Sequence, residues 1–209
     1  MTSTKTTIPS KITTIIFDLG GIFLKNIFRA LFIDLINEHN VALDTLRNAF
    51  GPNFQQWKLG KIEEKEFWQR FSRDAHLKGV SADHLMEKIR EKVACDEEML
   101  VYARELKKKF KLIAASNNTK ELGHDAIKRF KLNTLFDTIY LSCDMRLSKP
   151  DRQFFDYILE KEKLSAEECL FVDDKETITR AARRLGFPII TFTNKEEFER
   201  ELGRILEKH

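Results

Sequence analysis

Two acidic segments of this chain each follow a short apolar run and are candidates for metal chemistry. Asp18 comes after residues 13–17, and the pair Asp173 and Asp174 comes after residues 169–172. Apolar and β-branched runs of this length are typical of buried parallel strands, and open α/β sheets bind ligands at the carboxyl ends of their strands. Carboxylates from two strand ends suit Mg²⁺, which prefers oxygen ligands. We therefore expect a Mg²⁺ site at one edge of a sheet.

Two further predicted strands are followed by groups that could bind an anion. Ser116 and Asn117 follow the apolar residues 112–115, and Lys149 lies in the loop after residues 138–141. Each of them alone has an ordinary explanation, such as a helix cap or a solvated loop residue. Because such groups recur at successive strand ends, they predict one crevice in which a hydroxyl, an amide and an ammonium face a phosphate beside Mg²⁺.

The elements that would position these groups alternate between helix and strand from residue 96 onward, which is typical of a parallel sheet. The predicted fold class is therefore α/β, a Rossmann-like doubly wound parallel sheet of about five strands with an inserted helical cap domain. Besides the strand before Asp18, the sequence predicts strands at 111–115, 138–141, 169–172 and 188–192, and helices around 121–130, 151–161, 178–185 and 196–206.

Residues 25–95 contain only helix signals and predict the inserted cap. Gly51-Pro52 is expected to interrupt a helix within it. Its aromatic residues at helical spacing are assigned to a core in preference to substrate contact: Trp57, Phe67, Trp68 and Phe71. The predicted domains are a flexible tail at 1–10, an α/β core at 11–24 and 96–209, and a helical cap at 25–95.

Four short motifs follow one another and are spread over nearly the whole length of the chain. They are IIFDLGGI at 15–22, AASN at 114–117, LSKPD at 147–151 and FVDD at 171–174. By these motifs the chain resembles the haloacid dehalogenase superfamily, in particular its phosphatase branch with a helical cap and the subgroup with Asp-Leu-Gly-Gly or Asp-Leu-Gly-Asn. The resemblance implies a Mg²⁺-dependent phosphohydrolase that removes phosphate from a small phosphorylated metabolite, for example a sugar phosphate, through an aspartyl-phosphate intermediate.

The resemblance also implies the ligands of the metal. Asp18 would be the nucleophile and would bind Mg²⁺ through its other oxygen. The carbonyl of Gly20 and the carboxylate of Asp174 would complete the protein ligands, and Asp173 would assist. A carboxylate attacks a phosphate dianion poorly unless the charge is screened, which is the chemical reason for a metal here.

The remaining site residues would face the substrate. Lys149 and Ser116 would stabilise the equatorial phosphate oxygens, and Asn117 would orient the substrate. Three residues lie where the chain leaves Asp18 or turns within the predicted cap, and they are candidates for recognising the leaving group: Lys25, Asn26 and Gln56.

Two positions depart from the family pattern. Such phosphatases usually carry a second aspartate, the general acid, two residues after the nucleophile, where this chain has Gly20. General acid and base assistance is worth about 10²- to 10⁴-fold, so we expect either an activated leaving group or another proton donor. Four residues after Asp174, Ile178 replaces a supporting Asp or Asn, and Thr177 or Thr179 could take over that support.

These departures leave a second class of function open, a catalytically impaired module that binds a phospholigand or a protein partner. Haloacid dehalogenase activity is a third and less favoured hypothesis. That reaction uses no metal ion, whereas the paired aspartates of this chain suit a metal ion.

Composition limits the partners. The net charge is +3, from 36 basic and 33 acidic residues that are interleaved along the chain, which gives no support to nucleic-acid binding. No apolar run approaches the roughly 18 residues that span a bilayer. Cys95, Cys143 and Cys169 lack the close spacing of a zinc or disulfide framework. We expect a cytoplasmic protein, monomeric or homodimeric, with no membrane or nucleic-acid partner.

Overall fold

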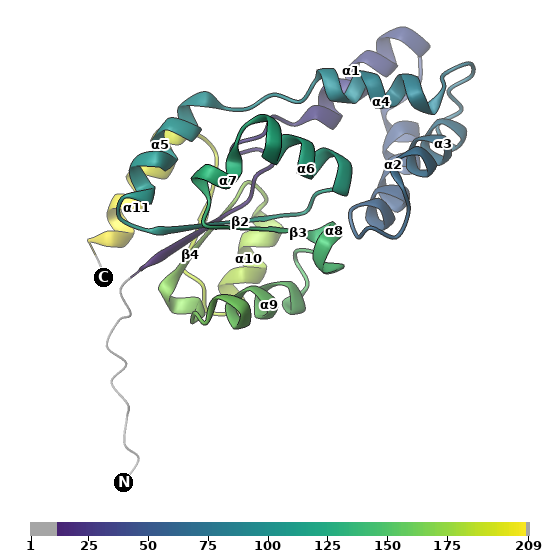
Figure 1. The fold of residues 1–209 in the computed structure, drawn as a ribbon. Helices are drawn as coiled ribbons and strands as arrows, with labels where there is room; N and C mark the ends of the chain where they lie inside the picture. The colour runs from purple at the N-terminus through teal and green to yellow at the C-terminus, as the bar shows by residue number, and fades with distance from the viewer. Residues whose placement is uncertain (1–11, 208–209) are drawn as a thin grey trace.

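A computed structural model of the chain describes residues 12–207 and is built on one parallel sheet (Figure 1). The five strands have the order β3-β2-β1-β4-β5. They are β1 (Thr14–Phe17), β2 (Lys111–Ser116), β3 (Thr138–Leu141), β4 (Cys169–Asp173) and β5 (Ile189–Thr191). The predicted α/β class and strand number are confirmed. The tail predicted at 1–10 lies outside the described residues.

The register of the central strands explains how distant parts of the sequence meet. Phe17 in β1 lies opposite Ala114 in β2 and opposite Val172 in β4. The backbone N–H of Asp18 donates to the carbonyl of Val172 at 2.8 Å. Because all these strands are parallel, their carboxyl ends lie at the same edge of the sheet. Asp18 therefore sits between the end of β2 and the end of β4.

Helices cover both faces of the sheet, and two clusters of buried residues mark the two faces. One face, with Ile15 and Phe17, packs against α5 (Glu97–Lys107), α6 (Lys120–Arg129), α7 (Leu132–Leu135) and α11 (Lys195–Leu206). The other face, with Ile16 and Phe171, packs against α9 (Arg152–Glu162) and α10 (Glu176–Arg184). The short elements α8 (Ser142–Met145) and η1 (Ala166–Glu168) complete this part.

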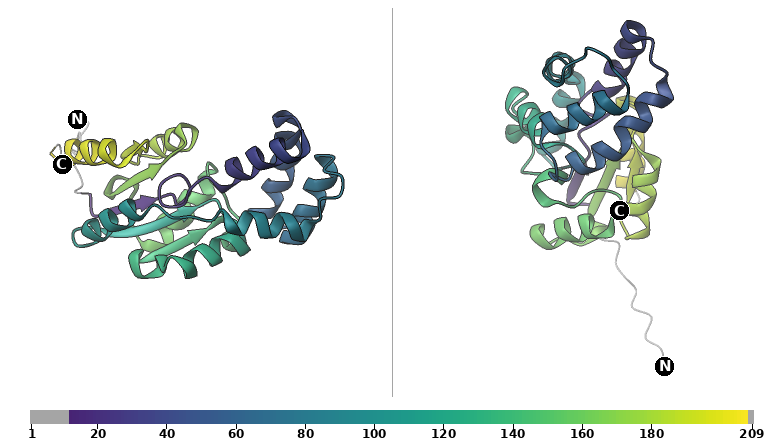
Figure 2. Two further views of the ribbon diagram at one scale, coloured as in Figure 1. Left: turned by 90° about the horizontal axis from the view of Figure 1, so that it is seen from above. Right: turned by 90° about the vertical axis from the view of Figure 1, so that its right-hand side faces the viewer.

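Residues 25–95, called the helical insertion below, run between β1 and β2. They form α1 (Ile27–His39), α2 (Leu43–Trp57), α3 (Glu64–Asp74) and α4 (Ala82–Glu91). Figures 1 and 2 show these helices together at one end of the molecule, beyond the carboxyl edge of the sheet. The aromatic residues assigned to the core of this part are at most 1% exposed, which confirms that assignment: Trp57, Phe67, Trp68 and Phe71.

The helix break expected at Gly51-Pro52 is wrong, because α2 continues through both residues. A proline inside a helix costs about 3 kcal/mol. Phe50 and Phe54, on either side of Pro52, stack with ring centroids 4.8 Å apart. Burial of apolar surface on both sides of the proline offsets its local cost, so packing overrides the local signal.

None of the helices within residues 12–207 is long and apolar enough to cross a membrane.

Candidate active site

Asp18 lies in a tight turn that presents its carboxylate at the end of β1. The residue is 4% exposed, and its side-chain Oδ1 accepts a hydrogen bond from the Leu19 N–H at 2.8 Å. Gly21 has φ +76°, a left-handed conformation that favours glycine. A Cβ at Gly21 would lie 2.4 Å from Oδ2 of Asp174. The turn therefore needs glycine at this position, both for its φ and for its contact with Asp174.

Both the backbone and the ammonium of Lys149 are fixed by contacts with other residues. Asn117 accepts a hydrogen bond from the Lys149 N–H at 2.9 Å and donates one to the Lys149 carbonyl at 2.8 Å. The Nζ of Lys149 lies 2.6 Å from Oδ2 of Asp173 and 3.0 Å from Oδ1 of Asp18. The lysine that the sequence places in a loop is thus 1% exposed and fixed between two strand ends.

The two aspartates at the end of β4 have different surroundings. Both oxygens of Asp173 are occupied, one by Lys149 and the other by the Lys175 N–H at 2.9 Å. Oδ1 of Asp174 is buried and has no hydrogen-bond partner within the described residues. Carboxylate oxygens of Asp18, Asp173 and Asp174 lie within 4.8 Å of one another. The geometry assigns Asp173 to the lysine and leaves Asp174 open to a ligand.

The electrostatics agree with this division. Burial and the nearby Asp18 raise the pKa of Asp173 to about 6, although Lys149 opposes the rise. Burial also raises the pKa of Asp174, against the effect of Lys175. Burial alone would lower the pKa of Lys149, but Asp18 and Asp173 outweigh it and raise that pKa. Three carboxylates around one ammonium leave an excess of negative charge.

This excess fits a divalent cation. A buried carboxylate oxygen without a partner is costly, and a hard cation with oxygen ligands removes that cost. Asp18 and the unpartnered oxygen of Asp174 have the right donor chemistry, and Gly20, in the turn after Asp18, lines the cavity with them. The residues present therefore fit Mg²⁺.

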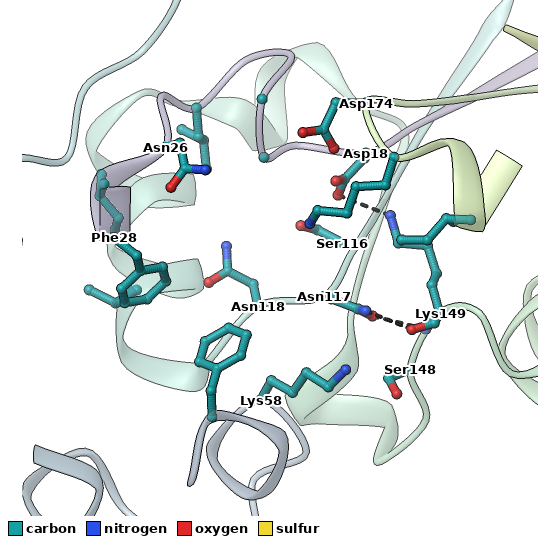
Figure 3. Close-up of a pocket in the computed structure, with 18 of the residues that line it drawn as sticks. Asp18, Asn26, Phe28, Lys58, Ser116, Asn117, Asn118, Ser148, Lys149 and Asp174 are labelled. Carbon is teal, nitrogen blue, oxygen red and sulfur yellow. Dashed lines mark hydrogen bonds and ion pairs between the residues drawn. The ribbon is translucent and has the colours of Figure 1, made fainter. Parts of the chain in front are cut away.

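A cavity of about 600 Å³ opens over these groups and is bounded by both the sheet edge and the helical insertion (Figure 3). Asp18, Ser116, Asn117, Lys149 and Asp174 all line it, as the sequence predicted for one shared crevice. Asp173 does not line it, since its side chain is fully buried behind Lys149. The side-chain hydrogen bonds of Asn117 to Lys149 give it a supporting position that the sequence did not predict; its contact with substrate stays a prediction.

The three residues expected to recognise a leaving group fare differently. Lys25 and Asn26 line the cavity. Gln56 does not; its Oε1 accepts a long hydrogen bond of 3.4 Å from Arg70 on α3. Its neighbour Gln55 lines the cavity instead. Gln56 was expected where the chain turns, but it lies within α2. One residue turns a helix by about 100°, so Gln55 and Gln56 face different directions.

Sequence reasoning missed two features of the cavity. Lys58, at the end of α2, is only 6% exposed and lines the cavity. A lysine that ends a helix is ordinarily read as a solvated residue that complements the helix dipole. Phe28, Phe50 and Phe54 also line the cavity with half-buried rings. The sequence predicted no role for these three rings, and only the arrangement of α1 and α2 shows that they face the cavity.

Ile178 does not supply the support that an Asp or Asn at this position would give. Ile178 is 5% exposed and belongs to the core beneath the site. The hydroxyl of Thr179 bonds to Thr191 at 2.8 Å, which commits it away from Lys149. Thr177 is exposed and lines the cavity. Lys149 is held by Asp173 and Asn117 without support from position 178.

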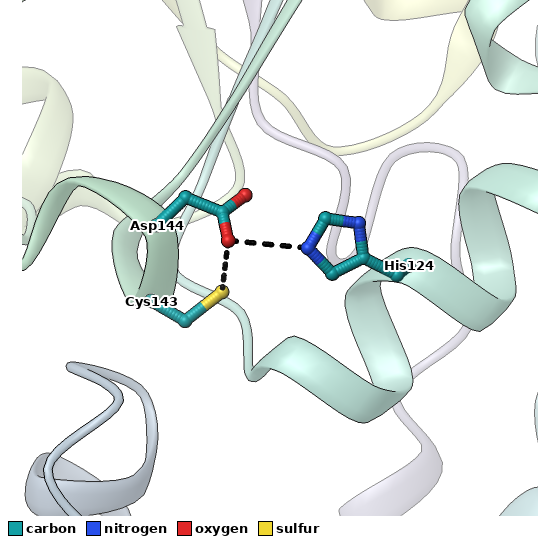
Figure 4. A group of neighbouring side chains, drawn as sticks. All are labelled: His124, Cys143 and Asp144. Carbon is teal, nitrogen blue, oxygen red and sulfur yellow. Dashed lines mark hydrogen bonds and ion pairs between the residues drawn. The ribbon is translucent and has the colours of Figure 1, made fainter.

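A second group of possible metal ligands lies outside this cavity (Figure 4). His124 lies 3.1 Å from Oδ1 of Asp144, and Sγ of Cys143 lies 3.7 Å from the same oxygen. Burial, with the charge of Asp144, raises the pKa of Cys143 to about 12, so the thiol stays neutral at pH 7. This group is explained by its own hydrogen bonds.

The sheet order and the acidic centre at the strand ends define the class of protein: a doubly wound α/β protein with three carboxylates gathered at the carboxyl edge of its sheet. The family is shown by comparison with known proteins. The chain belongs to the haloacid dehalogenase-like hydrolase family, whose model matches residues 15–192.

Relatives of known activity fall in more than one class. The chain is 27% identical over 177 residues to a sesquiterpene phosphatase from Aspergillus oryzae, covering 82% of this chain and 85% of the relative. It is 32% identical over 75 residues to a D-ribitol-5-phosphate phosphatase from Bacteroides thetaiotaomicron, covering 36% of each. It is 26% identical over 154 residues to a drimenol cyclase from Aspergillus calidoustus, covering 72% of this chain but only 29% of the cyclase.

A solved structure of a haloacid dehalogenase family enzyme from Bacteroides thetaiotaomicron has the same fold. The TM-score is 0.69 with 21% identity, covering 87% of this chain and 94% of the enzyme. That enzyme was solved in complex with magnesium and inorganic phosphate.

Proposed function

We propose that the protein is a Mg²⁺-dependent phosphatase that removes phosphate from a small phosphorylated compound through an aspartyl-phosphate on Asp18. One observation carries the proposal. Asp18, the ammonium of Lys149 and the unpartnered oxygen of Asp174 converge on the cavity that Ser116 also lines. A nucleophile, a phosphate-binding cation and a metal ligand are thus within one site. Family membership and the phosphatases among the relatives support the same reaction class.

In this proposal the residues divide the chemistry as follows. Asp18 attacks phosphorus while Lys149 and the hydroxyl of Ser116 stabilise the charge on the equatorial oxygens. Asp173 and Asn117 hold Lys149 in place from both sides. Asp18, Asp174 and the Gly20 carbonyl would hold Mg²⁺, which would screen the charge between nucleophile and phosphate and polarise the phosphorus. Water then hydrolyses the aspartyl-phosphate and releases inorganic phosphate.

We also propose the helical insertion, residues 25–95, as a cap domain over a core formed by 11–24 and 96–209. Two contacts support this division. Nε1 of Trp57 donates to Glu121 on α6 at 2.9 Å, and the hydroxyl of Ser142 donates to the carbonyl of Lys58 at 2.6 Å. A cap held over the cavity excludes bulk water and strengthens the electrostatic interactions inside.

The rival function is a catalytically impaired module that binds a phospholigand or a partner protein. Gly20, which carries no acid, favours it. The firm placement of Lys149 by Asp173 and Asn117 opposes it, because the support normally expected from position 178 is not needed to hold the lysine. We favour the enzyme.

Two substrate classes follow from the relatives, sugar or polyol phosphates and phosphates of apolar alcohols. The lining of the cavity favours the second. Phe28, Phe50 and Phe54 form one cluster with ring centroids 4.7 to 5.3 Å apart, and all three half-buried rings line the cavity. Leu122 and Ala126 of α6 line it as well. Such a wall packs against hydrocarbon and offers no hydrogen bonds to a polyol.

The proposal is tested with a panel of sugar, simple alkyl and prenyl phosphates in Mg²⁺ or EDTA. We expect Mg²⁺-dependent release of phosphate, fastest for the apolar esters, and loss to the background rate in Asp18→Asn. The exposed Asp44→Asn on α2 is the matched control and should keep wild-type activity. Intact mass spectrometry after acid quenching should find a phosphoryl group on the wild type and none on Asp18→Asn. No Mg²⁺-dependent turnover of any ester, with phosphate still bound, would favour the binding module.

The cytoplasmic location, the monomeric or homodimeric state and the lack of a membrane or nucleic-acid partner stay predictions from the sequence.

A further inference from the structure

Lys58 presents an ammonium to the cavity without an ionic partner. The residue is 6% exposed and lines the cavity, and its ammonium makes no hydrogen bond or ion pair with any residue from 12 to 207. In Figure 3 its side chain enters from the side of the helical insertion, across from Asp18. The ammonium is not enclosed by the protein, since Oδ1 of Asp174 is the buried side-chain atom without a partner in this part of the chain. It is therefore available to a ligand in the cavity.

The chain around Lys58 packs against α6 and α8 at Trp57, Lys58 and Gly60. Trp57 donates to Glu121 at 2.9 Å, and the carbonyl of Lys58 accepts from the hydroxyl of Ser142 at 2.6 Å. Gly60 has φ +63°, and a Cβ there would lie 3.0 Å from the carbonyl of Cys143. These contacts fix the end of α2 against α8 and α6. The extended side chain of Lys58 is thereby aimed into the cavity from a fixed root.

The charges around Lys58 do not neutralise it. Burial lowers its pKa; Asp151 opposes this change, and Lys175 and Lys149 add to it. Asp151 is exposed at the cavity mouth. An ammonium in these surroundings gives up a proton more readily than a solvated lysine does. Lys58 can therefore donate a proton to an alkoxide and then remain as a neutral amine.

The nucleophile side of the site offers no such acid. Gly20 carries no side chain that could donate a proton, and a Cβ there would lie 3.7 Å from Oδ2 of Asp18, in ordinary van der Waals contact. In an in-line displacement the leaving oxygen departs on the side opposite the attacking oxygen. Asp18 attacks from the sheet edge, so the leaving group faces the helical insertion, where Lys58 is found.

We propose that Lys58 is the proton donor to the leaving oxygen, in place of the acid that Gly20 lacks. The proposal rests on the phosphatase function above. As Asp18 forms its bond to phosphorus, the bond from phosphorus to the ester oxygen breaks, and that oxygen keeps the electron pair and takes a proton from Lys58. In the second half, water attacks phosphorus, its proton returns to the neutral amine of Lys58, and the bond to Asp18 breaks. The products are the alcohol and inorganic phosphate.

The test compares leaving groups in wild type and Lys58→Met, with Mg²⁺ present throughout. General acid assistance is worth about 10²- to 10⁴-fold, so kcat/KM for a simple alkyl phosphate should fall by that factor. For p-nitrophenyl phosphate, whose leaving group needs no proton, kcat/KM should change less than about tenfold on the same principle. Because water activation also suffers, Lys58→Met should accumulate the aspartyl-phosphate with this substrate, detected by intact mass. The exposed Lys61→Met, on the same loop, is the control and should match wild type.

A second variant makes the assignment specific. Gly20→Asp has room for its Cβ and would restore an acid near Asp18, so Lys58→Met/Gly20→Asp should regain turnover of the alkyl phosphate. Lys58→Met should also unfold at a urea concentration similar to that of wild type, because the ammonium makes no hydrogen bond or ion pair within residues 12–207.

Equal loss of kcat/KM on all leaving groups, with no rescue by Gly20→Asp, would show that Lys58 only binds substrate and would overturn this proposal alone. A wild type that neither hydrolyses any ester nor forms a phosphoenzyme would overturn the proposed function with it.

Discussion

The ammonium of Lys149 lies 2.6 Å from a carboxylate oxygen of Asp173, and neither side chain exposes any surface. Asp18 is the second acid on the same ammonium, at 3.0 Å. The lysine thus joins the ends of two strands and separates two buried carboxylates. Its place explains why the carboxyl edge of the sheet can hold so much negative charge before any metal binds.

Removing this lysine should destabilise the fold strongly in the absence of metal. Breaking a buried ion pair by deleting one partner costs about 3–5 kcal/mol, because the remaining charge is left buried. Lys149→Met should therefore lower the free energy of unfolding by that amount, measured by urea denaturation at pH 7 in EDTA. Mg²⁺ should restore part of the loss. The exposed Lys175→Met, which keeps its backbone bond to Asp173, should stay within about 0.5 kcal/mol of wild type. Equal stability of Lys149→Met and wild type would contradict the ion-pair account.

Alanine substitutions at Gly21 and Gly79, compared with each other, distinguish backbone strain from displacement of a metal ligand. Both are left-handed, with φ of +76° and +77°, but a Cβ at Gly21 meets Asp174 at 2.4 Å, whereas at Gly79 nothing lies within 4 Å. Alanine should cost about 1–2 kcal/mol of backbone strain at either position. Gly21→Ala alone should also push Asp174 aside, with about 10- to 100-fold weaker Mg²⁺ binding by calorimetry. Similar Mg²⁺ affinity in the two variants would show that Asp174 is not a ligand.

Asn117 should act on the position of Lys149. In Asn117→Asp the carboxylate still accepts from the Lys149 N–H but can no longer donate to the Lys149 carbonyl, now bonded at 2.8 Å. Loss of a supporting bond of this kind typically costs about 10- to 100-fold in activity. We expect that fall in kcat/KM for p-nitrophenyl phosphate, with wild-type values for the exposed Asn133→Asp. A fall in kcat/KM that appears only with bulky substrates would instead assign Asn117 to substrate orientation.

The parts of the site that the sequence predicted are those fixed by local pattern. A buried strand followed by a polar residue gives the end of that strand, and the parallel sheet then brings Asp18, Ser116 and Asp174 to one edge. These relationships survive small errors in element boundaries. Lys149 was predicted as a loop residue at the same edge, although its complete burial between Asp18 and Asp173 depends on tertiary packing.

The features that were missed depend on the phase and packing of helices. Gln55 lines the cavity and Gln56 does not, a difference of one step around α2. Pro52 is carried inside that helix because the phenylalanines around it pack together. Lys58 looks like a solvated helix end in the sequence and is turned into the cavity only when α2 docks against α8. No local pattern contains this information.

Glu162 gives a pH prediction at a point remote from the candidate metal ligands. It accepts from Tyr140 at 2.5 Å and pairs with Lys111 at 2.6 Å. Burial alone would raise the pKa of Glu162, but the bonds from Lys111 and Tyr140 outweigh it and lower that pKa. The stabilisation is therefore complete above the unfolded-state value near 4.5 and is lost as the pH falls through the lower folded-state value. Glu162→Gln should cost about 1–2 kcal/mol at pH 7 by urea unfolding, with the difference from wild type shrinking below that range. The exposed Glu160→Gln should show no such difference from wild type at pH 7 or at lower pH. If the difference in free energy of unfolding between Glu162→Gln and wild type did not change with pH, the charge of Glu162 would contribute nothing to stability.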